Sequence, residues 1–158
     1  MSQRSQIPVL DADDVVSIQR HAWWAVMEMH RKLALRLMAE ELRNETGIDR
    51  ATYDVLMHVV KAGDRGIRMT DLAQNVFMSK PGLTAVADRL EQRGLLRRMS
   101  DPEDRRAIRL TLTDRGLEIA QKASQVHLSG IENHFADHVT DTEARVILDV
   151  MRRVTPES

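Results

Sequence analysis

The stretch that decides the fold runs from residue 79 to residue 113 and reads SKPGLTAVADRLEQRGLLRRMSDPEDRRAIRLTLT. Its first part predicts a helix over 80–93, because Ser79 can cap it, Pro81 suits its first turn and Gly94 can stop it. An apolar stripe marks the buried face of this helix: Leu83, Val86, Ala87 and Leu90. The opposite face is small and polar (Lys80, Pro81, Thr84, Ala85 and Asp88), so it can come close to another surface.

The second part of the stretch predicts a β-hairpin. Residues 95–99 are expected to form a strand, and 100–105 a turn that Asp101 and Pro102 start. Ile108, Leu110 and Leu112 alternate with polar residues, which is typical of a half-buried return strand. A helix followed by a hairpin with an arginine-rich turn is the order that a winged DNA-binding module needs.

Outward from this stretch, the chain is predicted to be helical over 13–43, 50–62, 71–77, 114–138 and 142–154. Asp49, Thr70 and Thr113 are expected to cap three of these helices. The first helix has two apolar stripes, so one can pack on its own domain while the other suggests a partner chain. The fold class indicated is mainly α with a small β-hairpin wing, a winged helix-turn-helix with six helices.

Composition narrows the classes of function. A chain of 158 residues is most simply one domain, and the absence of cysteine excludes disulfides and thiolate metal sites. No apolar run approaches the roughly 18 residues of a membrane span, and residues 1–14 lack the apolar core of a signal peptide. We therefore expect a cytoplasmic protein. The sequence offers no nucleophile–base arrangement, phosphate-binding glycine loop or paired carboxylates, so we expect neither an enzyme nor a cofactor.

Charge is distributed unevenly along the chain. The net charge is −1, yet residues 79–115 hold nine basic and six acidic residues and are therefore +3. A local basic face on an acidic body is what binding to double-stranded DNA requires. The bland alternative is a solvated surface with an uneven charge pattern.

The predicted helix over 80–93 has the small polar face and free N-terminal N–H groups that suit a major groove, whereas arginines at a hairpin tip suit a minor groove. Asp104 is expected to hold an arginine side chain through a charge-assisted hydrogen bond. The candidate DNA-binding residues are Thr70, Ser79, Lys80, Pro81, Gly82, Thr84, Ala85, Asp88, Arg89, Asp104, Arg105 and Arg106.

The run DPEDRRAIRLTLTDRG over 101–116 resembles the wing pattern of the MarR family of bacterial transcription regulators, D-x-R-x-x-x-V-x-L-T followed by a glycine. Asp104, Arg106, Leu112 and Thr113 stand at its fixed positions, with Leu110 in place of the usual valine. The run DRLEQRGLLRR over 88–98 is similar to the family's helix end and first wing strand. Many members carry an arginine where this chain has Ala85, so a base-reading arginine is missing there.

The resemblance implies an intertwined homodimer that represses transcription at a pseudo-palindromic operator. It divides the chain into a disordered tail (1–12) and one domain (13–158). Within that domain, 13–45 and 114–154 would be dimerisation helices, and 49–113 the winged module. Arg106 and Arg105 would enter the minor groove, while Ser79, Lys80, Pro81 and Thr84 would face the major groove.

The resemblance also implies release from DNA by a small, often aromatic or phenolic effector. Candidate ligand residues are Trp23, Trp24, Met27 and His30 on the first helix and Tyr53 and His58 on the second. The alternative for the paired tryptophans is the core of a dimer interface.

Three histidines leave another alternative open. His127, His134 and His138 would lie along one side of the long helix over 114–138, and the last two have a spacing that can chelate zinc. No fourth ligand is evident, so surface or interface histidines are the simpler interpretation, with no metal site. The alternatives to a ligand-responsive repressor are thus a metal-responsive regulator and a winged-helix adaptor that binds proteins.

Overall fold

A computed structural model of the chain describes residues 18–76, 78–104 and 106–155. The predicted tail over 1–12, the first part of the predicted first helix, Phe77 and Arg105 lie outside these residues. The described chain begins with one continuous helix made of α1 (Ile18–Met29), the π-helical segment η1 (His30–Leu37) and α2 (Met38–Thr46). Gly47 ends this helix, as the sequence predicts.

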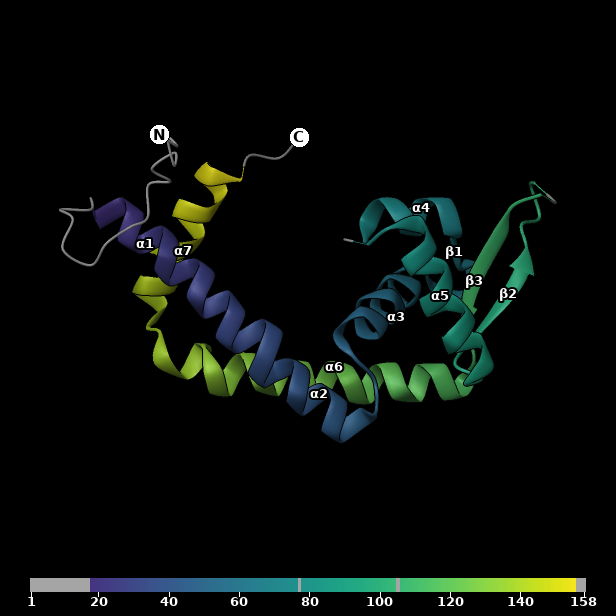
Figure 1. Cartoon of the computed structure of the whole chain (residues 1–158), viewed down its shortest axis with the longest axis horizontal. Helices are drawn as coiled ribbons and strands as arrows, with labels where there is room; N and C mark the ends of the chain where they lie inside the picture. The colour runs from purple at the N-terminus through teal and green to yellow at the C-terminus, as the bar shows by residue number, and fades with distance from the viewer. Residues whose placement is uncertain (1–17, 77, 105, 156–158) are drawn as a thin grey trace, which may run out of the picture.

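The winged module follows. It contains α3 (Arg50–Ala62), the 3-10 turn η2 (Gly63–Arg65), β1 (Ile67–Arg68), α4 (Met69–Asn75), α5 (Lys80–Gln92), β2 (Leu96–Ser100) and β3 (Ile108–Leu112). The three strands form an antiparallel sheet in the order β1-β3-β2. The predicted helices and hairpin are confirmed, whereas β1 was not predicted. Figure 1 shows the hairpin of β2 and β3 extending away from the body of the module.

The chain returns through α6 (Asp114–His134), the 3-10 turn η3 (Ala136–His138) and α7 (Asp141–Val154). The long first helix crosses α6. At the end of α6 that lies opposite the wing, the chain turns into α7 (Figure 1). When α1, η1 and α2 are counted as one, the described chain has the six helices that were predicted. The predicted helix over 114–138 is too long, because the backbone of Phe135 leaves the helical conformation at φ −137°. None of the described helices is both long and apolar enough to span a membrane.

Side-chain caps explain where several helices begin. The side chains of Asp49, Ser79 and Thr113 accept hydrogen bonds from the backbone N–H groups three residues later, which confirms them as N-caps of α3, α5 and α6. The prediction for Thr70 is wrong. Helix α4 begins at Met69, so Thr70 lies inside its first turn and its hydroxyl contacts the carboxylate of Asp71.

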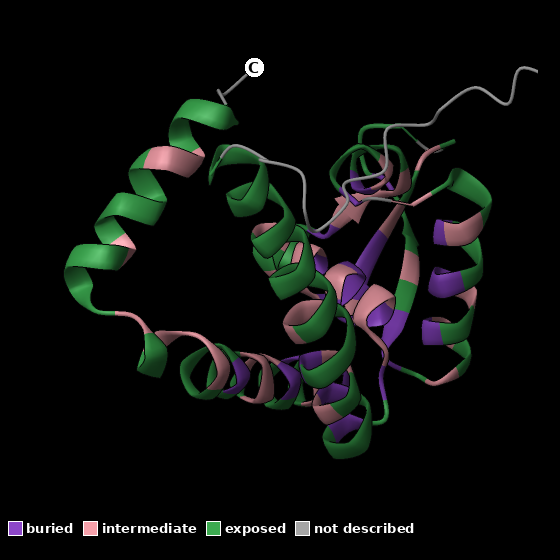
Figure 2. Ribbon diagram, turned by 60° about the vertical axis from the view of Figure 1, so that its left-hand side comes forward, coloured by how far each residue is buried: buried purple, intermediate pink, exposed green. Residues whose placement is uncertain are grey.

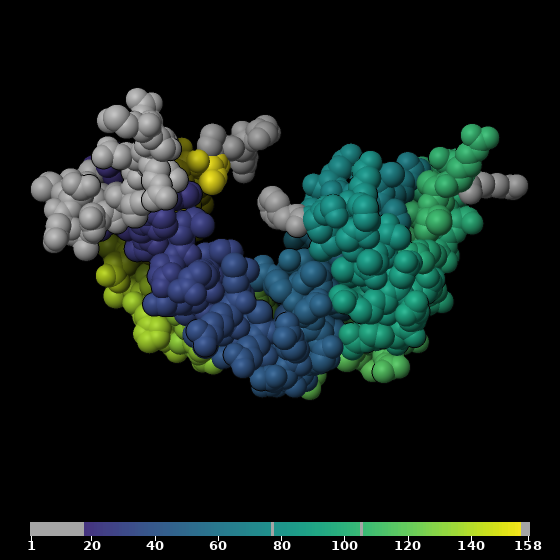
Figure 3. Space-filling model, viewed as in Figure 1, coloured from purple at the N-terminus to yellow at the C-terminus, as the bar shows by residue number. Residues whose placement is uncertain are grey.

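The core lies in the winged module and where α2 and α6 meet it. The largest fully buried apolar side chains are Leu42, Ile48, Leu56, Leu72, Leu83, Leu90, Leu95, Leu96 and Leu110. In contrast, neither α1 nor α7 contains a buried residue (Figure 2). A wide hollow separates these two helices from the winged module in Figure 3.

Candidate nucleic-acid interface

The outer face of α5 presents little free polar chemistry. Its inner stripe is buried as predicted, and Lys80, Pro81, Thr84 and Ala85 are exposed. The Thr84 hydroxyl donates to the carbonyl of Lys80 at 3.1 Å, so its hydrogen is used within the helix. The methyl groups of Thr84 and Ala85 then dominate the middle of this face. Such a face can contact a thymine methyl group but cannot make a bidentate hydrogen bond to a base.

The N-terminus of α5 is suited to a phosphate. The Ser79 hydroxyl oxygen accepts from the Gly82 N–H at 3.2 Å, which leaves its own hydrogen available to donate. Lys80 is exposed beside it, and the helix N-terminus adds partial positive charge. Ser79, Lys80 and Gly82 therefore fit the backbone-positioning part of a DNA interface.

Two of the predicted DNA-binding side chains on α5 form ion pairs or hydrogen bonds with other residues of the protein. Asp88 binds the guanidinium of Arg98 at 2.5 Å, and Glu91 binds the same guanidinium at 2.7 Å, so this cluster ties β2 to α5. Arg89 donates to Asp49 at 3.1 Å and to Thr52 at 3.0 Å, which joins α5 to the start of α3. Both side chains thus have partners on neighbouring elements, and their contact with DNA stays a prediction.

The structure does not confirm the expected role of Asp104, which stays a prediction. Its carboxylate accepts from the backbone N–H of Arg106 at 3.0 Å, and it holds no arginine side chain among the described residues. The carboxylate that does so is Asp101, which is fully buried and binds Arg68 at 2.6 Å and Arg109 at 2.5 Å. Hydrogen bonds, first from the Arg68 side chain, hold the pKa of the Asp101 carboxyl well below its ordinary value. The sequence marked Asp101 only as the start of a turn.

The wing tip carries the exposed arginine that the sequence predicts. Arg106 is exposed just beyond the turn, and no described side chain forms an ion pair with it. Its neighbour Arg105 lies outside the described residues. Thr70 is exposed at the start of α4. The exposed basic tip of a thin hairpin, next to the small face of α5, has the form of a two-part DNA-reading surface.

The joint between the wing and α6 is tightly built. The Thr113 hydroxyl donates to the carbonyl of Gly94 at 2.7 Å and accepts from the Gly116 N–H at 2.9 Å. At Gly116 a Cβ atom would lie 1.9 Å from the carbonyl oxygen of Leu95, so only glycine fits there. The threonine and glycine at the end of the wing pattern thus fasten the winged module to α6.

The structure does not gather the predicted ligand residues. Trp23 and Trp24 remain 62% and 54% exposed on α1, with Met27 also exposed. Tyr53 is buried on α3, where its ring lies 4.9 Å from that of His127 on α6, and His58 is half-buried on the same helix. Within one chain these six residues do not line a shared cavity, and their role in binding a ligand stays a prediction.

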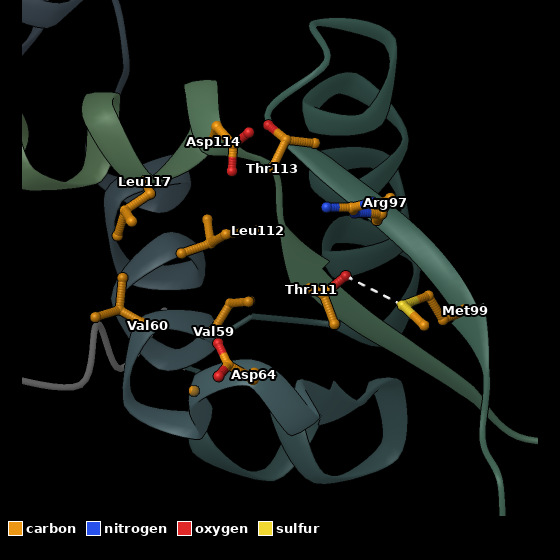
Figure 4. Close-up of a pocket in the computed structure, with 11 residues that line it drawn as sticks. Val59, Val60, Asp64, Arg97, Met99, Thr111, Leu112, Thr113, Asp114 and Leu117 are labelled. Carbon is orange, nitrogen blue, oxygen red and sulfur yellow. Dashed lines mark hydrogen bonds between the residues drawn. The ribbon is translucent and has the colours of Figure 1, made fainter.

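Two cavities that the sequence did not indicate are present. An apolar one of about 250 Å³ lies between the first helix and α6, and His30 is the one predicted ligand residue that lines it, with Met29, Leu33, Ala34, Met38, Ile131, His134 and Phe135. A cavity of about 460 Å³ lies behind the wing, between α3, the sheet and the start of α6 (Figure 4). Its lining in Figure 4 mixes Val60, Leu117 and Met99 with charged Arg97 and Asp114.

Each of the three histidines of the C-terminal region has a different environment. His127 contacts Tyr53, His134 forms a 2.6 Å hydrogen bond with Glu41 on α2, and His138 lies in the turn η3. Because α6 ends at His134, the expected helical spacing of His134 and His138 is lost. Within the described residues, no group of three or more histidine, aspartate or glutamate side chains could hold a metal ion.

Comparison with known proteins agrees with this geometry. Residues 46–107 match the MarR family. The HTH-type transcriptional repressor MdtR of Bacillus subtilis is 34% identical over 76 residues, which is 48% of each chain. The match thus spans about half the length of that relative. These proteins are transcription regulators and not enzymes.

Two solved structures show the same fold. Sco3205 of Streptomyces coelicolor, a MarR family regulator in complex with DNA, aligns with a TM-score of 0.78 over 89% of this chain and 90% of its own, at 24% identity. The organohalide-sensing regulator RdhR-CbdbA1625, bound to 2,4-dichlorophenol, aligns at 0.74 over 94% and 86%, at 14% identity. The winged module, the wing pattern and the helical frame of this chain are thus similar to those of the MarR family of winged helix-turn-helix transcriptional regulators, whose model matches residues 46–107.

Proposed function

We propose that two copies of the chain form a homodimer that represses transcription at a pseudo-palindromic operator and leaves it when a small aromatic molecule binds. The observation that carries the DNA part is the exposed Arg106 at the tip of the hairpin, beside the small exposed face of α5. The MarR family relative Sco3205 is seen in complex with DNA, and MdtR is named as a repressor.

The dimer is supported by the apolar surface of the frame. Large apolar side chains stand exposed on α1, α6 and α7 (Ile18, Trp23, Trp24, Met27, Leu128, Ile131, Val146, Ile147, Leu148 and Val154). Exposed apolar side chains in such number mark an interaction site, and a second copy of the chain would cover them symmetrically. Two winged modules would then be held at a fixed spacing, as two half-sites require.

The effector is supported by the apolar cavity beside His30. Its volume of about 250 Å³ is below the range of drug-sized pockets, so it fits a molecule with a single ring. The regulator RdhR-CbdbA1625 has the same fold and was solved with the one-ring phenol 2,4-dichlorophenol. A panel of one-ring phenols added to the protein–DNA complex tests this part. Release by none of them would contradict it.

Replacing Arg106 with alanine tests the DNA part. An operator is first selected from random DNA, and its affinity is then measured by fluorescence anisotropy. Arg106→Ala should weaken binding about tenfold or more, because one good arginine contact in a groove is worth about 1–3 kcal/mol. It should also flatten the salt dependence of binding.

The control variant Arg36→Ala removes the same charge from an exposed position on η1 and should leave the affinity unchanged. Equal affinities of wild type and Arg106→Ala would contradict the wing assignment. Failure to select any DNA sequence would favour the protein-binding adaptor.

A further inference from the structure

Asp101 is the one charged side chain that is fully buried among the described residues; the other buried polar residues are threonines. Its carboxylate accepts four hydrogen bonds. Oδ2 takes the Nε–H groups of Arg68 and Arg109, and Oδ1 takes the backbone N–H groups of Glu103 and Asp104 at 2.8 and 3.2 Å. A buried carboxylate is tolerated only when it is paired and hydrogen-bonded in this way.

The two oxygens face different parts of the module. Through Oδ1, Asp101 shapes the turn that leads to the wing tip, and its own N–H closes that turn on the carbonyl of Ala107 at 3.0 Å. Through Oδ2, it reaches Arg68 in β1, the residue directly before α4. One carboxylate therefore joins the wing tip to the start of the helix-turn-helix.

Arg109, in β3, also joins the wing to the segment before α4. Its guanidinium also donates to the carbonyl of Gly66 at 3.2 Å, ahead of β1. Gly66 has φ +65°, and a Cβ there would lie 2.4 Å from the carbonyl oxygen of Leu110 in β3. The segment before α4 is thus packed backbone to backbone against the wing, with the Asp101 cluster at its edge.

We propose that Asp101 is a positioning residue for DNA binding: it holds the wing tip, and with it Arg106, at a fixed place relative to the helix-turn-helix. This inference rests on the proposed DNA-binding function of the wing. The carboxylate itself is fully buried and reaches DNA only through the geometry of the turn. An arginine held at the wrong place loses its groove contact even though its charge remains.

A double-mutant cycle on the full-length protein tests the proposal. Asp101→Asn keeps the size of the side chain but removes the charge that pairs with two guanidinium groups. It should weaken binding to the selected operator about tenfold or more. Combined with Arg106→Ala, it should weaken binding hardly further than Arg106→Ala alone, because both changes remove the same contact.

The control variant is Asp54→Asn, which breaks an exposed ion pair with Arg50 on α3 and should leave the affinity unchanged. Melting temperature and sedimentation are measured on every variant. If Asp101→Asn does not fold, Arg68→Gln takes its place in the cycle, since Arg68 is 31% exposed and its loss leaves Arg109 on the carboxylate.

The outcomes separate the two claims. If the fold-losses of operator affinity caused by the two substitutions multiply in the double variant, Asp101 acts on general stability. The positioning role is then overturned. An unchanged affinity of Asp101→Asn, with a clear loss for Arg106→Ala, overturns the inference and leaves the proposed function standing. An unchanged affinity of Arg106→Ala overturns the wing assignment itself.

Discussion

The winged module and the helical arm of α1 and α7 differ in how far they bury their apolar side chains. The module buries a continuous apolar core and fastens its surface with ion pairs such as Arg98 with Asp88 and Glu91. The arm buries no residue and leaves two tryptophans in solvent. The difference indicates that the module is stabilised within one chain, whereas in the proposed dimer the arm would take its stability from the surface of the second chain.

The largest effect is expected from a charge placed on the arm. Ile147→Glu puts a carboxylate in the apolar stripe of α7, where a partner chain would bury it without a counter-charge. We expect about 3 kcal/mol or more of lost association, a dissociation constant for the dimer raised more than 100-fold, and loss of operator binding. Sedimentation over a range of concentrations measures the first quantity.

Thr142→Glu is the matched control, because it adds the same charge to the polar side of α7. It should leave the dimer intact. If Ile147→Glu stays dimeric while its helix content is unchanged, the arm is not the dimer interface. The arm would then not be stabilised by a partner chain.

The second effect concerns the joint between the regions. Gly116→Ala forces a methyl group against the carbonyl of Leu95 and should cost about 3 kcal/mol of unfolding free energy, at the upper end for overpacking. Gly82→Ala, in the first turn of α5, meets only the Ser79 hydroxyl and should be near neutral. Urea unfolding measures both. Equal stabilities would show that the joint is looser than the structure describes.

The smallest effect is a pH dependence at the contact between Tyr53 on α3 and His127 on α6. Burial lowers the pKa of His127 below its ordinary value, so the folded state favours the neutral ring. This contribution is complete above about pH 6.5, the ordinary pKa of histidine, and is lost as the pH falls through the lower folded-state pKa. His127→Phe keeps an aromatic ring and should flatten that part of the pH–stability curve.

The exposed histidine His21 provides the comparison for that experiment. His21→Gln should leave the slope of stability against pH as it is in the wild type. A His127→Phe variant with the wild-type slope would mean that the acid sensitivity arises elsewhere.

Local patterns were enough to predict most of the fold. Helix stripes, the N-caps at Asp49, Ser79 and Thr113 and the alternation in β3 are short-range signals, and the structure confirms them. The strand β1 was not predicted, because it has only two residues and forms only by pairing with β3, more than forty positions later. The cap predicted at Thr70 failed because α4 begins before it.

The site was predicted less completely, since its charges are arranged by long-range contacts. Asp88 and Arg89 look available on a helical projection, yet each has a partner on another element. Asp101 and Asp104 sit in one acidic turn, and only the fold shows that Arg68, 33 positions earlier, selects Asp101. The exposed residues Lys80, Thr84 and Arg106 were predictable because exposure requires no partner.

The mass of the complex with its selected operator tests the central claim most directly. Sedimentation of wild-type protein with one duplex should give two chains per duplex, and Ile147→Glu should not form that complex at the same concentration. One chain bound tightly to one duplex, with an unchanged affinity for Ile147→Glu, would contradict the account of a DNA-reading module carried on a shared helical frame.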